Sequence, residues 1–127
     1  MKLVIFGATG SIGRQLVQQA LEQGHIVTAF VRDRAKLDDQ HQNLKVVQGD
    51  VLNLEEVERG VKQSHLDWTI VRPSAFIDGS RTGQYRQGFP GTDKTTKLKI
   101  SRADVADFML QQLTNNSYLY QTPGISY

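Results

Sequence analysis

Three glycines, at positions 7, 10 and 13, stand in the segment "GATGSIG" near the start of this 127-residue chain. In such a pattern Gly7 permits a tight turn, Gly10 lets a diphosphate approach the main chain, and Gly13 lets a helix pack close to a strand. At the start of a helix, free N–H groups and the helix dipole favour phosphate charge, and the hydroxyls of Thr9 and Ser11 add possible donors. The alternative is a tight turn that needs glycine for its geometry alone.

The elements on either side of the glycines decide between these readings, because the pattern is informative only between a strand and a helix. The preceding "KLVIFG" is an apolar run typical of a strand buried on both faces. In the following "SIGRQLVQQALEQG" apolar residues recur at helical spacing, and Gly24 stands where a helix C-cap belongs. The segment therefore predicts a dinucleotide-binding loop.

The end of the next predicted strand, "HIVTAFV", indicates which dinucleotide is bound. It is followed by Arg32, Asp33 and Arg34. An acidic residue here would bind the ribose 2′-hydroxyl of NAD, whereas arginine would meet the 2′-phosphate of NADP. Two guanidinium groups can clamp a phosphate, so the segment favours NADP, while Asp33 keeps NAD open. The third possibility is that these are solvated loop charges.

A third predicted strand, "LKVVQGD", ends at Asp50 and Val51. In this architecture Asp50 could accept from the adenine amino group while Val51 packs on the ring. Alternatively, Asp50 only caps the helix that follows.

The remaining pattern alternates helices with strands, which predicts a single α/β domain over residues 1–127 with a parallel sheet. Asn53 and Glu56 are placed as the N-cap and capping-box residue of a helix over 53–65. Residues 66–73 predict a strand that ends at Pro73, and residues 78–99 a long polar loop that could hold a short hairpin. Ser101 is the expected N-cap of a helix over 101–116, and residues 124–127 could add a closing strand.

The composition excludes several classes of protein. Without cysteine the chain can form neither a disulfide framework nor a thiol nucleophile, and its three histidines make no ligand-spacing motif. A net charge of +2 is weak support for nucleic-acid binding, which we do not expect. No apolar run has the roughly 18 residues of a membrane span, and no signal peptide is visible, so a cytoplasmic location is expected.

Five stretches resemble the atypical short-chain dehydrogenase/reductase group of NAD(P)-binding proteins, nearest to its NmrA-like and flavin/biliverdin-reductase-like members. In chain order they are "KLVIFGATGSIG", "VTAFVRD", "VVQGDV", "LDWTIVRPSAFIDG" and "ISRADVADFML". The resemblance implies a Rossmann-like three-layer fold and cofactor contacts from the loop Gly7–Gly13, which includes Ile12. It also implies contacts from Arg32, Asp50 and Val51, and a nicotinamide end near Pro73 and Ser74.

The chain departs from this family between Val61 and Lys62. Relatives carry there a long stretch with two more strands and often a catalytic Ser, Tyr and Lys, and no Tyr-x-x-x-Lys occurs in this sequence. We interpret "VKQSHLDWTIVRP" as a junction between two helix segments, which leads to a shortened sheet in the order 3-2-1-4 with a possible fifth strand. Alternatively, the shortening leaves an apolar edge that a second chain covers in a homodimer.

Two functions follow from this reading. One is a small NADP-dependent reductase that transfers hydride to a flavin- or quinone-like acceptor, because hydride chemistry resides in the cofactor. Tyr85 and Arg86, in the long loop, could then contact a planar or anionic substrate, or could be surface residues. The other is a non-catalytic module that binds or senses NADP(H), which the absent middle segment favours.

Overall fold

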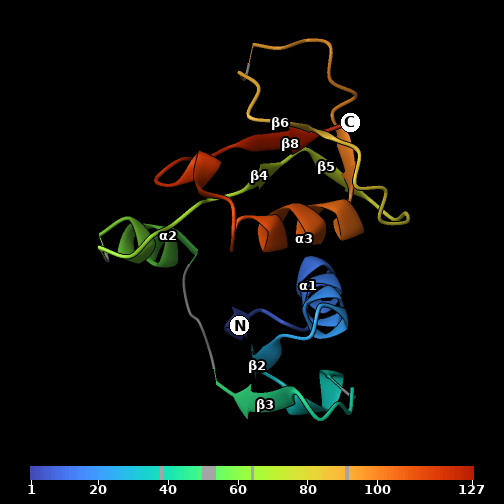
Figure 1. Ribbon diagram of the computed structural model, residues 1–127, viewed down its shortest axis with the longest axis vertical. Helices are drawn as coiled ribbons and strands as arrows, with labels where there is room; N and C mark the ends of the chain where they lie inside the picture. The colour runs from blue at the N-terminus through green and yellow to red at the C-terminus, as the bar shows by residue number, and fades with distance from the viewer. Residues whose placement is uncertain (38, 50–53, 64, 91) are drawn as a thin grey trace. The chain divides into compact units, whose positions relative to one another are not determined.

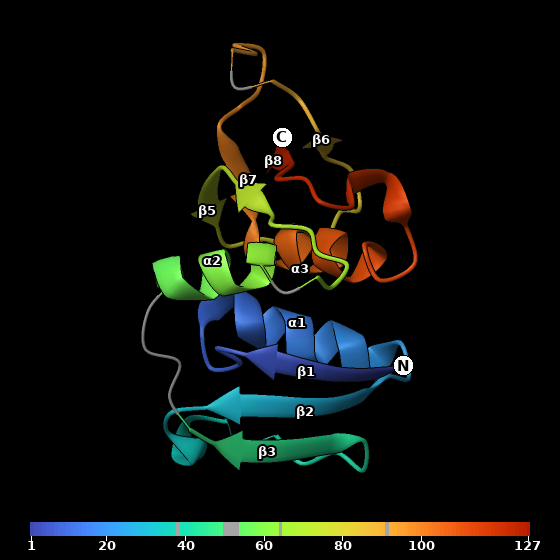
Figure 2. The same cartoon turned by 90° about the vertical axis from the view of Figure 1, so that its left-hand side faces the viewer.

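A computed structural model describes residues 1–37, 39–49, 54–63, 65–90 and 92–127 of the chain. They belong to two compact units, unit 1 over Met1–Leu52 and unit 2 over Asn53–Tyr127. Figure 1 labels most helices and strands of both units, and Figure 2 also labels β1 and β7. The predicted single domain over the whole chain stays a prediction.

Unit 1 is a parallel sheet of three strands with one long helix. The strands are β1 (Lys2–Phe6), β2 (Ile26–Val31) and β3 (Leu44–Gln48), and they pair in the order β3-β2-β1, as predicted. Figure 2 shows the three arrows side by side and pointing the same way. Helix α1 (Ser11–Glu22) joins β1 to β2, and a 3-10 turn, η1 (Arg34–Lys36), lies between β2 and β3.

The sheet and α1 share an apolar core because the apolar residues of each recur at the period that places them on one face. Alternate strand residues point to the same face, and Ile5 lies beside Ala29 on the buried face of β1 and β2. Val17 and Ala20 of α1, which are spaced by about one helical turn, are fully buried. After α1, Gly24 adopts a φ of 80°, the left-handed conformation that ends helices. The core therefore holds β1 and the start of α1 rigidly around the glycine loop.

Unit 2 contains helices α2 (Leu54–Gln63) and α3 (Arg102–Gln111) and a 3-10 turn, η2 (Asn116–Tyr118). Its strands are short, and they are β4 (Arg72–Pro73), β5 (Ala75–Ile77), β6 (Arg86–Gln87), β7 (Lys99–Ser101) and β8 (Gly124–Ser126). They form one sheet in the order β4-β8-β6 and a separate parallel pair, β5-β7. The α/β class is as predicted, and β8 is the predicted closing strand, parallel to β4.

Several predicted elements of unit 2 need correction. The strand expected over residues 66–73 is regular only at its end, in β4, with one isolated bridge from Thr69 to Gln121 before it. The expected loop over 78–99 contributes β6, which pairs antiparallel with β8 rather than within a hairpin. The last helix ends at Gln111, five residues early. Asn53 and the side chain of Glu56 lie outside what the structure describes, so their capping roles stay predictions. The predicted position of the fourth strand beside the first in the sheet order also stays a prediction.

A buried carboxylate organises unit 2. Asp104 has no exposed surface, and it accepts hydrogen bonds from the main-chain N–H of Thr82 at 2.8 Å and of Gly83 at 3.0 Å. The hydroxyls of Thr82 and Tyr127 donate to its second oxygen. Its own N–H donates at 3.1 Å to Oγ of Ser101, which confirms Ser101 as the N-cap of α3. One side chain thus ties the loop at residues 82–83 to α3 and the C-terminal strand.

We predict that Asp104→Asn lowers the free energy of unfolding at neutral pH by about 2–3 kcal/mol. An amide NH2 in place of Oδ1 would face two main-chain N–H donors, and in place of Oδ2 it would lose the hydrogen bonds that the hydroxyls of Thr82 and Tyr127 donate. Burial alone raises the pKa of the Asp104 carboxyl, but hydrogen bonds from Tyr127, Thr82 and Gly83 outweigh it and hold the pKa below its usual value. A depressed folded-state pKa stabilises the fold above the unfolded value of about 3.9, and this stabilisation is lost as the pH falls toward the folded-state pKa.

Urea unfolding as a function of pH measures both effects. The wild type should lose stability below about pH 4 more steeply than Asp104→Asn. The exposed Asp78 is the control, since its pair with Arg102 at the surface should be worth less than about 1 kcal/mol. Equal stability of Asp104→Asn and the wild type would contradict the role of this carboxylate.

Candidate functional site

The loop between β1 and α1 has the shape that its glycines predict. Gly7 adopts a φ of 66°, a left-handed conformation that L side chains rarely take, and its carbonyl accepts from the N–H of Gly10 at 2.9 Å. A Cβ on Gly13 would lie 2.1 Å from the carbonyl oxygen of Gly7, whereas a Cβ on Gly10 would lie 3.2 Å from it. The tight turn therefore requires Gly7, and the close packing of α1 requires Gly13.

The first turn of α1 is left open for a negative ligand. Gly10 is its N-cap, so no side chain caps the helix, and its first turn holds no acidic residue. By contrast, α3 is capped by the hydroxyl of Ser101 and carries Asp104 in its first turn. Uncapped N–H groups at a helix N-terminus attract phosphate, and Ser11 stands exposed in this turn. The loop with α1 is therefore suited to a diphosphate.

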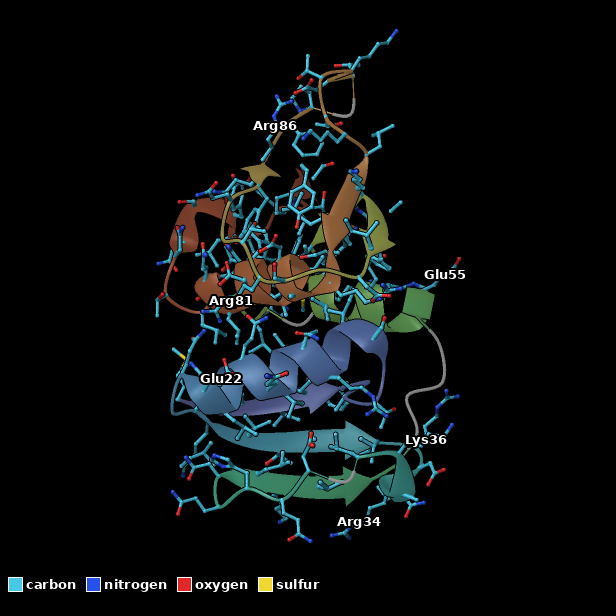
Figure 3. All side chains as sticks on the ribbon, turned by 90° about the vertical axis from the view of Figure 1, so that its right-hand side faces the viewer. Glu22, Arg34, Lys36, Glu55, Arg81 and Arg86 are labelled. Carbon is cyan, nitrogen blue, oxygen red and sulfur yellow. The ribbon has the colours of Figure 1, made fainter. Side chains whose placement is uncertain are left out.

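In the turn after β2, the acidic residue and the two arginines on either side of it have different roles. Oδ1 of Asp33 accepts from the N–H of Ala35 at 3.0 Å and so caps η1. Arg32 and Arg34 on either side are exposed, and neither guanidinium has a hydrogen-bond partner among the described residues. Figure 3 shows Arg34 and Lys36 on this part of unit 1. Two cationic side chains are thus available, while the carboxylate between them is already engaged.

The predicted site residues are only partly brought together. Unit 1 holds the loop Gly7–Gly13, which includes Thr9, Ser11 and Ile12, together with Arg32 and Arg34. Asp50 and Val51 lie outside the described residues, so their predicted adenine contacts stay predictions. Pro73 belongs to β4 of unit 2, where it pairs with Ile125, and its predicted place near the nicotinamide also stays a prediction.

The sequence analysis missed Arg14. Its Nε donates to the carbonyl of Thr9 at 3.0 Å and its Nη2 to the carbonyl of Lys36 at 2.6 Å. One guanidinium thereby joins the glycine loop to the turn after β2. The available signal was an arginine directly after the third glycine, where a helical side chain points back toward the loop.

Unit 2 contains a pocket of about 480 Å³ lined by Thr82, Gln84, Tyr85, Arg86, Lys97 and Tyr127. The hydroxyl of Tyr85 donates to Asp107 at 2.8 Å, and its ring packs edge-on against Phe108. Burial, followed by the hydrogen bond to Asp107, raises the pKa of Tyr85 far above its usual value. Its phenol therefore stays protonated at neutral pH and cannot act as a general base. Arg86 is paired with Asp93 at 2.6 Å.

Among the described residues, no group of His, Asp and Glu side chains could hold a metal ion. No helix in the described part of the chain is long and apolar enough to cross a membrane.

The model of a protein family described as NAD(P)H-binding matches the chain in two stretches, residues 7–63 and 55–116. Together they cover most of the chain, and they overlap over residues 55–63. The overlap includes residues 61 and 62, between which the sequence analysis predicts a junction.

Curated relatives match over shorter stretches. A 3-beta-hydroxysteroid dehydrogenase from Mycolicibacterium neoaurum is 36% identical over 90 residues, which are 68% of this chain and 24% of that protein. YwnB from Bacillus subtilis is 39% identical over 54 residues, which are 42% of this chain and 24% of that protein. The matches thus span about a quarter of the length of these relatives.

Solved structures share the fold. A Rossmann-fold NAD(P)-binding family protein from Shigella flexneri superposes with a TM-score of 0.80 at 18% identity, covering 98% of this chain and 92% of that one. A wide-type short-chain dehydrogenase/reductase from Veillonella parvula, solved with NADP, has a TM-score of 0.76 at 13% identity, covering 99% and 94%. At such identities the likeness shows a Rossmann-like fold.

We predict that Gly13→Ala lowers the free energy of unfolding by about 1–3 kcal/mol, because the new Cβ would overlap a main-chain carbonyl that cannot swing away. Gly10→Ala is the matched control, since its Cβ would be only slightly too close to the same oxygen. Urea unfolding of the two variants should rank Gly13→Ala as the less stable. The reverse order would contradict the packing described here.

Proposed function

Since the chain belongs to the NAD(P)H-binding family, we propose that it binds NADP(H) through unit 1 and passes hydride to a planar acceptor of the flavin or quinone type. The turn after β2 carries this proposal. Arg32 and Arg34 are exposed on either side of Asp33, whose carboxylate already caps η1. A ribose 2′-phosphate would find two cations there, whereas a 2′-hydroxyl would compete with Ala35 for the one carboxylate.

The glycine loop fits the diphosphate of such a ligand. Gly7 makes the turn, Gly10 leaves its surface free of a side chain, and the uncapped first turn of α1 directs N–H groups outward. Thr9 and Ser11 add hydroxyl donors within the same loop. A single loop therefore supplies the turn, the close main-chain approach and the hydrogen-bond donors that a diphosphate needs.

The chemistry of hydride transfer would come from the nicotinamide ring of the bound dinucleotide. The chain would contribute binding and orientation, and we assign no catalytic residue. A flavin or quinone accepts hydride with little need for a protein acid or base, which suits a chain without Tyr-x-x-x-Lys. The pocket lined by Tyr85 and Tyr127 has aromatic walls of the kind that planar rings favour.

A second function has its own support. The family match falls in two overlapping stretches, and the sequence lacks the tyrosine–lysine pair that the family resemblance implies for many relatives. Both observations suit a chain that kept a nucleotide site and lost catalysis. This protein would then bind or sense NADP(H) without turnover.

We predict that Arg32→Ala weakens NADPH binding roughly tenfold and NADH binding much less, because only NADPH offers a 2′-phosphate for the lost charge-assisted bonds. Parallel calorimetric titrations with the two dinucleotides measure the ratio. Lys45→Met, which removes an exposed positive charge from β3 of the same unit, is the matched control. Equal losses for both dinucleotides would refute the 2′-phosphate role of Arg32.

An assay of NADPH oxidation with FMN or a soluble quinone separates the two functions. We expect turnover that saturates with NADPH and is abolished in Gly10→Val, whose branched side chain would occupy the space of the diphosphate. Binding of NADPH without turnover of any acceptor would favour the sensing module. Unchanged affinity in Gly10→Val would sink the assignment of the glycine loop.

A further inference from the structure

Arg14 connects two segments that are far apart in the sequence. It lies in the first turns of α1, where its main-chain N–H donates to the carbonyl of Gly10 at 2.9 Å. Its side chain returns along the helix and donates to the carbonyls of Thr9, at 3.0 Å, and Lys36, at 2.6 Å. A planar guanidinium can donate in two directions at once, so a single side chain links both carbonyls.

The segment tied by Arg14 has few other restraints. The carboxylate of Asp33 accepts from the N–H of Ala35 at 3.0 Å, and Nε2 of Gln48 in β3 donates to the carbonyl of Arg32 at 3.2 Å. The turn η1 is only three residues long, and its own hydrogen bonds run from Lys36 N–H to Asp33 at 3.1 Å and from Leu37 N–H to Arg34 at 3.3 Å. All residues from 32 to 36 are exposed, and Leu37, with 5% of its surface exposed, is the buried anchor of the turn. Such short 3-10 turns are weak by themselves. The hydrogen bond from Arg14 to Lys36 is therefore a long-range restraint at the end of the turn, as that from Gln48 is at its beginning.

The two tied segments are the same two that would bind the phosphates of a dinucleotide. Thr9 lies in the glycine loop, and Lys36 ends the turn that begins just after Arg32. A ligand that touches both segments gains affinity when their spacing is set before it binds, because less ordering has to occur on binding. That gain is specific to a ligand that uses the turn, which means one with a 2′-phosphate.

We infer that Arg14 is a positioning residue that sets the preference for NADP(H) over NAD(H) by holding the arginine-bearing turn against the glycine loop. The inference rests on the proposed dinucleotide binding. Nε and Nη2 of Arg14 each donate to a main-chain carbonyl, and hydrogen exchange measured without ligand distinguishes this restraint from a direct phosphate contact by the remaining donors. The positioning role also differs from a general stabilising role, because losing a general stabilising role would lower the affinity for both dinucleotides alike.

The test compares the wild type with Arg14→Met, Arg14→Lys and the charge control Lys45→Met, by titrating each with NADPH and NADH. We expect Arg14→Met to bind NADPH roughly tenfold more weakly while NADH affinity changes less than about threefold. Arg14→Lys keeps the charge but has one nitrogen, which cannot reach both carbonyls in the fork geometry, so it should resemble Arg14→Met. Lys45→Met should keep the wild-type ratio.

Amide hydrogen exchange without ligand supplies an independent readout. In Arg14→Met the amides of Ala35, Lys36 and Leu37 should exchange at least several-fold faster, while those paired between β1 and β2 should not change. Unchanged exchange in the turn would overturn the tether, as would full restoration of the affinity ratio by lysine.

The outcomes also separate this inference from the proposed function. A wild type that prefers NADPH, together with an unchanged ratio in Arg14→Met, would overturn the role of Arg14 and leave the proposed function standing. A wild type that binds neither dinucleotide would overturn both.

Discussion

The close approach of α1 to the carbonyl of Gly7 is the constraint on which unit 1 depends. Any Cβ at position 13 would lie 2.1 Å from that oxygen, so the helix can start there only because Gly13 has none. The same approach leaves α1 without a side-chain cap, since Gly10 occupies the cap position. The geometry that lets the helix pack on the sheet therefore also exposes its first N–H groups to a ligand.

In unit 1, hydrogen bonds determine which charged side chains remain available to a ligand. Asp33 lies between two arginines and could pair with either, yet its carboxylate bonds to the main chain two residues on. The guanidinium of Arg14 donates two hydrogen bonds to main-chain carbonyls. Arg32 and Arg34, on either side of Asp33, stay exposed. The hydrogen bonds of this short turn thus determine which charged side chains remain available to bind a phosphate.

Unit 2 is organised around Asp104 instead of around a regular sheet. Its strands are two or three residues long, and the buried carboxylate of Asp104 on α3 accepts hydrogen bonds from the loop at residues 82–83 and from Tyr127, which follows β8. Short strands contribute few ladder bonds, so the satisfied carboxylate supplies much of the specificity of the arrangement. The family model matches in two overlapping stretches, an arrangement that suits the interpretation of residues 61–73 as a junction.

Local patterns in the sequence were enough to predict the parts of the fold that depend on near neighbours. They predicted the first three strands, α1 with its glycine loop, and the Ser101 cap, because each rests on a period of two or on residues within one helical turn. The order of these strands came from the family resemblance and the crossover rule. Only the tertiary structure decided that Asp33 caps η1, that Arg14 joins segments 27 residues apart, and that β5 pairs with β7. Such partners are chosen by distances in the folded chain, which no spacing along the sequence records. The sequence could therefore identify the residues able to bind a dinucleotide, whereas the fold selected which of their charges remain available.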